Sequence, residues 1–292
     1  MILVTGGTGN AGSEAVRALI ERDYQVRVFV RDAERAEGLF GGSVELALGD
    51  FGDAGSVRDA LEGVSDVVLS CADDPRRVEW ETAAIDAAIR AGVRRIVKLS
   101  TLAASPGAPV AFWDWHGRVE QYLRKSGIAA VILQSSFYMS NLLAAAKSVA
   151  HEGRFYAPAG GARIAMIDPR DVGAAAAAVL ASDEHDGLTY VLTGPEAITY
   201  SQVAAKLSAA IGRPVEFVDV PDDAARQGMV EAGMPDFVAD QVVNIFEMLR
   251  QGVADRVTDT FASLTGAAPR DFAEFASDHA RLFEPETAAS GL

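Results

Sequence analysis

The chain has 292 residues, of which 49% are hydrophobic and 23% charged, an ordinary composition for a folded protein that argues against global disorder. Its formal net charge of -15 repels phosphate backbones and anionic membranes, so nucleic acid and lipid surfaces are poor candidate partners. A chain of this length can hold one large domain, or a core domain with an appendage.

Signals for export, membrane insertion and metal binding are missing from the sequence. No positively charged leader precedes an apolar stretch, and no apolar run is long enough to cross a bilayer, so we expect a cytoplasmic protein. The single cysteine, Cys71, excludes an internal disulfide framework, and the four histidines lack the usual zinc spacings. We therefore expect no structural metal.

Short apolar segments alternate with amphipathic segments through the first half of the chain. The segments typical of strands are ILVT, QVRVFV, VELAL, DVVLS, RIVKLS and AAVILQS, and TYVLTG can add a seventh. This alternation predicts an α/β fold with a doubly wound parallel sheet that carries helices on both faces.

The first predicted strand leads directly into a glycine-rich loop. Gly7, Gly9 and Gly12 have the G-x-G-x-x-G spacing at the start of a predicted helix. Glycines permit the tight turn and the close backbone approach, and the helix N-terminus presents free N–H groups to a pyrophosphate. We expect residues 1–150 to form a dinucleotide-binding Rossmann domain, completed by a strand near 188–193.

The second predicted strand ends at Arg31. At this position, dinucleotide-binding folds have either an acidic residue that binds a ribose hydroxyl of NAD or a basic residue that binds the 2′-phosphate of NADP. A guanidinium matches a phosphate by paired hydrogen bonds, which favours NADPH. Asp32 leaves the alternative that a carboxylate binds the hydroxyl and that Arg31 is a surface charge. Arg35, one turn onward, can assist.

Two further positions follow predicted strands. After the third strand, Asp50 can bind an adenine amine and Phe51 can flank the ring, or the pair is a polar turn followed by a core phenylalanine. Cys71 follows the fourth strand, where a small pocket-lining residue is a better interpretation than a redox nucleophile.

The second half of the chain reads as mainly helical. Thr199 and Gln202 form a capping box, Gly212 ends the same helix, and an alanine-rich run after Asp168 indicates close helix packing. A strand is expected in PVEFVDV. We expect most of residues 151–292 to form a smaller C-terminal subdomain.

The chain resembles the NmrA-like, atypical short-chain dehydrogenase/reductases, which include NADPH-dependent quinone reductases and triphenylmethane-dye reductases. The segments that carry the resemblance are VTGGTGNAG, Arg31, GDF, IVKLS, QSSFYMSNLL, IDPRDVGAAAAAVL and LTGPEAITYSQVAAKLSAAIGRPVEFVDV. The resemblance implies a Rossmann domain with a substrate-covering subdomain, bound NADP(H), and either reductase activity or nucleotide sensing without catalysis.

The resemblance also assigns site residues. The implied cofactor residues are Gly6, Thr8, Gly9, Asn10 and Ala11 in the phosphate loop, Arg31 at the 2′-phosphate, Asp50 and Phe51 at adenine, and Cys71 and Ala72 beside the nicotinamide ribose. The segment after VILQ would present Ser135, Phe137 or Tyr138 to the nicotinamide. Members often have arginine and proline where this chain has Gln134 and Ser135, a departure within that pocket.

A typical short-chain dehydrogenase uses a tyrosine as proton donor and a lysine one turn later, and here His116 and Glu120 stand in those places. We expect the Glu120 carboxylate to favour a protonated imidazole that can donate a proton. The open alternative is a partly exposed His–Glu pair on the helix surface that has no catalytic role. Tyr138 is a rival donor. Ser100 can bind a carbonyl or a ribose.

Aromatic residues near these positions are candidate substrate walls. They are Trp113, Trp115, Phe137 and Tyr138, and the tryptophans can equally be core residues or a homodimer contact. Hydride reduction of a quinone needs mainly orientation, because water can supply protons. The hypothesis is an NADPH-dependent reductase of a quinone or another conjugated electrophile, such as an enone, ketone or imine. The alternative is an NADP(H)-sensing regulatory protein without turnover.

Overall fold

The structure is a computed structural model that describes residues 1–285. These residues form two compact units that interleave along the chain. Unit 1 consists of residues 1–135, 169–192 and 259–268, and unit 2 consists of residues 136–168, 193–258 and the chain from Pro269 onward. Each unit therefore takes segments from both halves of the sequence.

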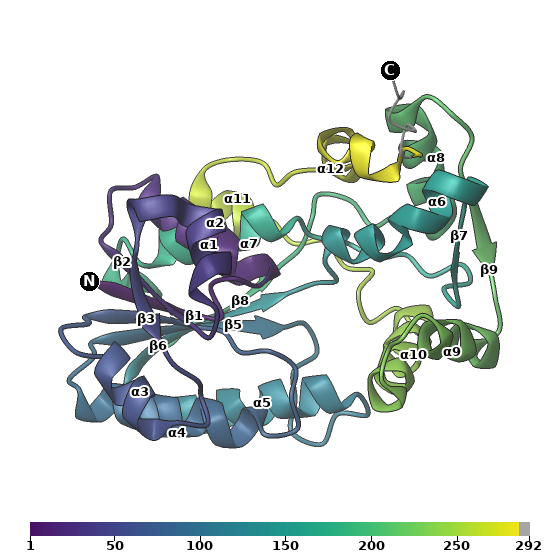
Figure 1. Cartoon of the computed structure of the whole chain (residues 1–292). Helices are drawn as coiled ribbons and strands as arrows, with labels where there is room; N and C mark the ends of the chain where they lie inside the picture. Colours follow the sequence, from purple (N-terminus) through teal and green to yellow (C-terminus); the bar gives the residue numbers. More distant parts are fainter. Residues whose placement is uncertain (286–292) are drawn as a thin grey trace. The chain divides into compact units, whose positions relative to one another are not determined.

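Unit 1 is built on a parallel sheet of seven strands within the described residues, in the order β3-β2-β1-β4-β5-β6-β8 (Figure 1). The strands are β1 (Ile2–Thr5), β2 (Val26–Val30), β3 (Glu45–Leu48), β4 (Asp66–Leu69), β5 (Arg95–Thr101), β6 (Ala129–Ser135) and β8 (Thr189–Leu192). The order reverses between β1 and β4, and ligands of open α/β sheets bind beyond the carboxyl ends of the strands at such a point. The predicted doubly wound fold is confirmed.

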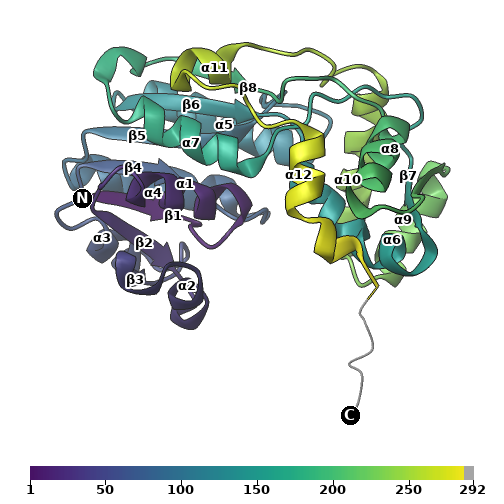
Figure 2. The same ribbon diagram turned by 90° about the horizontal axis from the view of Figure 1, so that it is seen from above.

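Helices cover both faces of this sheet. They are α1 (Asn10–Ile20), α2 (Ala33–Phe40), α3 (Ala54–Ala60), α4 (Arg77–Arg90), α5 (Ala111–Lys125), α7 (Pro169–Val179) and α11 (Thr260–Thr265), with a short 3-10 turn η1 (Gly41–Ser43) and another, η3 (Asp183–His185). Helices α1, α7 and α11 lie on one face, and α3, α4 and α5 on the other (Figure 1). Figure 2, seen from the side of α1 and α7, shows these two helices lying over the strands of the sheet.

Helices α1 and α7 pack with almost no space between their backbones. A Cβ atom placed on Gly173 would lie 2.4 Å from the Glu14 carbonyl carbon. Ala175, Ala176 and Ala177 are fully buried on the same helix. Small side chains allow helix backbones to approach closely, so the alanine-rich run has the packing role that was predicted.

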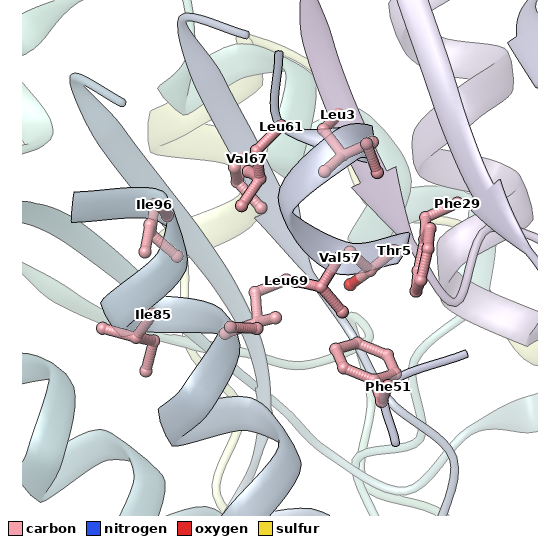
Figure 3. A pocket seen from close by; sticks show the side chains of 13 residues that line it. Leu3, Thr5, Phe29, Phe51, Val57, Leu61, Val67, Leu69, Ile85 and Ile96 are labelled. Carbon is pink, nitrogen blue, oxygen red and sulfur yellow. The ribbon is translucent and has the colours of Figure 1, made fainter. Parts of the chain in front are cut away.

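An apolar core fills the space between the sheet and helices α3, α4 and α5. A pocket in this core is shown in Figure 3, where Phe51 lies beside Val57 and Leu69. Thr5 is the polar residue in its lining, and the Thr5 hydroxyl donates to the Ser70 carbonyl (2.7 Å) and accepts from the Ser70 N–H (3.0 Å). The pocket therefore offers no free polar group to a charged cofactor.

Unit 2 combines helices with a small parallel sheet. Its elements are η2 (Met139–Ala145), α6 (Ala146–Glu152), β7 (Arg154–Ala157), α8 (Tyr200–Ile211), β9 (Glu216–Asp219), α9 (Asp222–Glu231), α10 (Asp236–Arg250), α12 (Phe272–Asp278) and η4 (Ala280–Phe283). The predicted capping box of Thr199 and Gln202 is present at the start of α8. Strand β9 was predicted and pairs with β7, which was not, because four residues (RFYA) carry too little pattern.

Aromatic rings form the centre of unit 2. Tyr200 packs edge-on against Phe155, Phe217 and Phe246, with ring centroids 5.4 to 5.9 Å apart. Tyr200 is buried, and this burial raises the pKa of its phenol. Such edge-to-face contacts add to the stabilisation from apolar burial, so this cluster is a core and not a reactive phenol.

Candidate functional site

The glycine-rich loop between β1 and α1 is shaped by close backbone contacts. Gly6 has φ of +60°, and a Cβ atom there would lie 2.9 Å from the Ser70 carbonyl oxygen. A Cβ atom on Gly12 would lie 2.2 Å from the Gly6 carbonyl oxygen. Side chains at these positions would therefore displace the loop, which explains why glycine stands at both.

The N-terminus of α1 differs from those of the two helices that follow. Asp32 caps α2 and Asp53 caps α3 by accepting backbone N–H groups, whereas α1 has Gly9 at its N-cap and no side-chain cap. The first N–H groups of a helix are unsatisfied within the helix and attract anions. The predicted loop residues surround this end, with Gly9 and Asn10 exposed, Thr8 half-buried and Ala11 buried.

Arg31, at the end of β2, points into solvent. Its side chain is 75% exposed, and Nη1 lies 4.0 Å from the Asp50 carboxylate. Asp32, the rival ribose residue, accepts the Arg35 N–H (3.0 Å) as the cap of α2. The Arg35 guanidinium donates to the Thr8 carbonyl of the phosphate loop (3.0 Å). Two arginines therefore lie at this end of the loop, and the neighbouring carboxylate is occupied by a helix end.

Asp50 and Phe51 both have structural roles. The Asp50 carboxylate accepts the Gly52 N–H (2.8 Å), which makes the polar turn after β3. The Phe51 ring packs edge-on against Phe29 and nearly parallel to Trp80, with centroids 6.4 Å apart in the second pair. Trp80, on α4, was not predicted, because no motif marks a single aromatic residue on an amphipathic helix.

Cys71 follows β4 and is an unreactive thiol. Burial raises its pKa to about 12, and the nearby Glu81 charge acts in the same direction. Because the thiolate is the nucleophile, this thiol is inert at neutral pH. The Cys71 carbonyl accepts from Arg77 (2.9 Å), which fixes the backbone next to the exposed Ala72.

A buried set of charges connects α4 with β5. Lys98 and Glu81 are fully buried, and the Lys98 Nζ lies 2.7 Å from Glu81 Oε1. Arg77 contacts the other carboxylate oxygen of Glu81 at 3.3 Å. Burial lowers the pKa of Lys98. The orientation of Lys98 could not be predicted from its strand, and the structure shows it pointing to α4.

His116 and Ser100 lie together in the structure. His116 Nδ1 is 3.3 Å from Ser100 Oγ, and the Ser100 hydroxyl donates to Glu120 Oε1 (2.5 Å). The Glu120 carboxylate also accepts from Gln134 and Arg124. The Glu120 carboxylate is thus held by three donors, one each from β5, β6 and its own helix α5.

The expectation of a protonated His116 is wrong. Burial lowers the pKa of the imidazole well below 6.5, and the positive charges of Arg77 and Lys98 lower it further. The i, i+4 spacing on α5 predicts a direct His116–Glu120 pair, whereas Ser100 from β5 lies between the ring and Glu120. A neutral imidazole is therefore the form to consider in the site.

The aromatic candidates fall in both units. In unit 1, Trp113 and Trp115 are 8% and 9% exposed, and Trp115 packs edge-on against Phe112. In unit 2, the Phe137 ring packs against Phe246, with centroids 6.1 Å apart. The backbone around Tyr138 is bound to Ile167 on both sides, by the Phe137 carbonyl and the Met139 N–H. Their contact with a substrate stays a prediction.

Within residues 1–285, no helix is long and apolar enough to span a bilayer. Over the same range, no three side chains of histidine, cysteine, aspartate or glutamate are grouped as ligands of a metal ion.

The reversed sheet order, the glycine-rich loop and the uncapped α1 define a Rossmann-type dinucleotide-binding protein. The chain belongs to the NmrA-like family, whose model matches residues 1–276. The predicted resemblance is thereby confirmed.

Three similar proteins extend over nearly the whole chain. An NAD(P)H azoreductase from Xenophilus azovorans is 38% identical and covers 97% of this chain and 99% of its own. A (4-alkanoyl-5-oxo-2,5-dihydrofuran-3-yl)methyl phosphate reductase from Streptomyces griseus is also 38% identical, covering 98% and 100%. The Escherichia coli NADPH-dependent quinone oxidoreductase, solved with NADPH, has a TM-score of 0.86 at 30% identity and covers 95% and 99%. The names of these proteins agree with the predicted enzyme class, an NAD(P)H-dependent oxidoreductase.

Proposed function

We propose that the protein is an NADPH-dependent reductase that transfers hydride to a quinone or another conjugated electrophile, such as an enone, ketone or imine. The observation that carries the proposal is the uncapped N-terminus of α1 behind a glycine loop, with Arg35 bound to that loop and Arg31 at the end of the neighbouring strand β2. The reductase names of the relatives support the reaction type.

NADPH is preferred over NADH because of the residues after β2. The Arg31 guanidinium is exposed, with a loose 4.0 Å contact to Asp50, and can pair with a 2′-phosphate, whereas the Asp32 carboxylate accepts a helix N–H and is turned toward α2. Arg35 adds a second positive charge next to the loop. Asp50, Phe51, Cys71 and Ala72 would complete the adenine and ribose contacts.

The bound cofactor would supply the hydride, and the chain would supply orientation. Neutral His116 is a poor acid, so we assign no proton donation to it. Tyr138 or solvent would provide the proton, and Ser100 would bind a carbonyl or a ribose. Trp113, Trp115 and Phe137 would offer apolar contacts to the substrate.

A panel of quinones, azo compounds, enones and imines, assayed by the loss of NADPH absorbance, tests the proposal. We expect turnover with at least one class, and faster turnover with NADPH than with NADH. Tight NADPH binding with no turnover across the panel would overturn the reductase and favour a nucleotide sensor. In that case a partner protein that is captured only in the presence of NADPH would identify the regulated process.

A further inference from the structure

The hydrogen bonds around Ser100 determine which nitrogen of His116 carries the proton. Glu120 accepts from the Ser100 hydroxyl (2.5 Å), from Gln134 Nε2 (3.0 and 3.1 Å) and from Arg124 Nη2 (2.9 Å). A carboxylate that receives three donors acts purely as an acceptor. The single hydroxyl proton of Ser100 is therefore directed at Glu120.

Ser100 Oγ must then accept a hydrogen bond from the imidazole. His116 Nδ1 lies 3.3 Å from this oxygen, so Nδ1 carries the hydrogen. In a neutral imidazole with Nδ1–H, the other nitrogen, Nε2, has a lone pair and is an acceptor. The chain of bonds from Glu120 through Ser100 thus fixes the ring as a hydrogen-bond acceptor at Nε2.

The surroundings of the ring also keep it neutral. His116 is 8% exposed, and the positive charges of Arg77 from α4 and Lys98 from β5 act on it. The Glu120 carboxylate contacts the Ser100 hydroxyl and pairs with Arg124. These features disfavour an imidazolium at this position.

The position of His116 in the fold indicates which part of a cofactor it meets. The phosphate loop follows β1, and the adenine side lies toward β2 and β3, so the nicotinamide half extends toward β4, β5 and β6. Ser100 is next to the last residue of β5 and is paired with Gln134 of β6. His116 lies in the second turn of α5, which starts at the same carboxyl edge of the sheet. The groups in that half of the cofactor that can donate to Nε2 are the ribose hydroxyls and the carboxamide N–H groups.

We propose that His116 accepts a hydrogen bond through Nε2 from the nicotinamide half of the cofactor, from a ribose hydroxyl or the carboxamide N–H, as an acceptor that Ser100 and Glu120 hold in the Nδ1–H form. This role rests on the proposed use of NADP(H). It makes His116 a cofactor-positioning residue, and it replaces the acid role that spacing suggested. The same acceptor could instead meet a hydroxyl of the reduced product, and the experiment below separates the two.

Two substitutions distinguish the roles of the two ring nitrogens of His116. Glutamine in His116→Gln places its amide near the position of Nε2, whereas asparagine in His116→Asn places its amide near Nδ1 and does not reach the ligand. We expect His116→Asn to weaken NADP⁺ binding about fivefold, which is the loss in affinity expected from one typical hydrogen bond. His116→Gln should retain most of the affinity. Adenosine 2′,5′-bisphosphate, which lacks the nicotinamide half, should bind both variants as it binds the wild type.

Calorimetric titration of NADP⁺ and of the bisphosphate into each protein gives the affinities. Unchanged NADP⁺ affinity in His116→Asn would overturn the proposal. If this variant binds NADP⁺ normally and shows only weaker inhibition by the reduced product, His116 meets the product and not the cofactor. Equal losses for both ligands would also overturn it, because they indicate a general disturbance of unit 1. A wild-type chain that binds neither ligand would instead refute the proposed function itself.

A second readout uses the wild-type chain without any ligand. Nitrogen-15 NMR distinguishes the two neutral tautomers and the imidazolium, and the signals of His116 are those that disappear in His116→Asn among the four histidines of the chain. We expect the Nδ1–H tautomer at neutral pH, a change at Nε2 when NADP⁺ binds, and a mixed tautomer in Ser100→Ala. An Nε2–H tautomer or an imidazolium in the wild type would overturn the proposal.

Discussion

The phosphate loop and the Ser100–His116–Glu120 cluster are two parts of unit 1 that are built in opposite ways. The loop is made of backbone, and its shape depends on the absence of side chains at Gly6 and Gly12. The cluster is made of side chains from β5, β6 and α5 that satisfy one another in a buried place. A backbone site is encoded locally, whereas a side-chain site depends on which partners the fold brings together. This difference predicts how each part responds to substitution.

The largest effect is expected where a buried charge loses its partner, as in Glu81→Ala. Lys98 and Arg77 would then lack the carboxylate that they share, and breaking a buried pair costs about 3–5 kcal/mol. Urea unfolding measures the loss. Asp59→Ala is the matched control, since Asp59 pairs with Arg58 on the surface and should change stability by less than about 1 kcal/mol. Equal effects of the two substitutions would mean that the buried charges are not coupled.

Substitution in the loop should affect binding more than stability. The added methyl of Gly12→Ala would lie 2.2 Å from the Gly6 carbonyl oxygen and would displace the loop, so we expect NADPH affinity to fall on the order of a hundredfold. Gly38→Ala is the control, because nothing lies within 4 Å of a Cβ atom on that residue of α2. It should leave binding unchanged. Titration of NADPH into both variants measures the two affinities. Undiminished binding by Gly12→Ala would exclude this loop as the phosphate site.

Arg31→Ala tests the cofactor preference at the edge of the loop. A charged hydrogen bond to the 2′-phosphate would be lost, so NADPH affinity should fall about tenfold more than NADH affinity. Arg58→Ala, another exposed arginine of unit 1, should change neither affinity. If Arg31→Ala weakens the binding of both cofactors to the same extent, Asp32 or another residue determines which ribose substituent is bound.

The smallest expected effect is a pH dependence that His116 adds to stability. The pKa of His116 is lowered in the folded chain, so the unfolded chain binds a proton that the folded chain does not as the pH falls below 6.5. Stability should therefore fall with decreasing pH, by at most about 1.4 kcal/mol per pH unit from this residue. Urea unfolding at several pH values should give a shallower slope for His116→Gln than for the wild type. Identical slopes would show that burial does not shift this histidine.

Local signals predicted the parts of the fold that depend on neighbours in sequence. The strand pattern, the glycine spacing and the Thr199 capping box each involve residues within a few positions, and each is present. The contacts of Ser100 with Glu120 and of Lys98 with Glu81 join residues 20 and 17 positions apart on different elements. Tertiary packing decides such pairs, so the charge state of His116 was predicted wrongly from helix spacing alone.

The interleaving of the two units has a consequence for synthesis on the ribosome. Strand β8 and helices α7 and α11 of unit 1 come after residue 168, and unit 1 is complete only when residue 268 has been made. Until β8 has been made, the edge of β6 that it will cover is unpaired, and unpaired strand edges favour association with other chains. A nascent chain of this protein must therefore carry an open sheet edge while residues 136–192 are added.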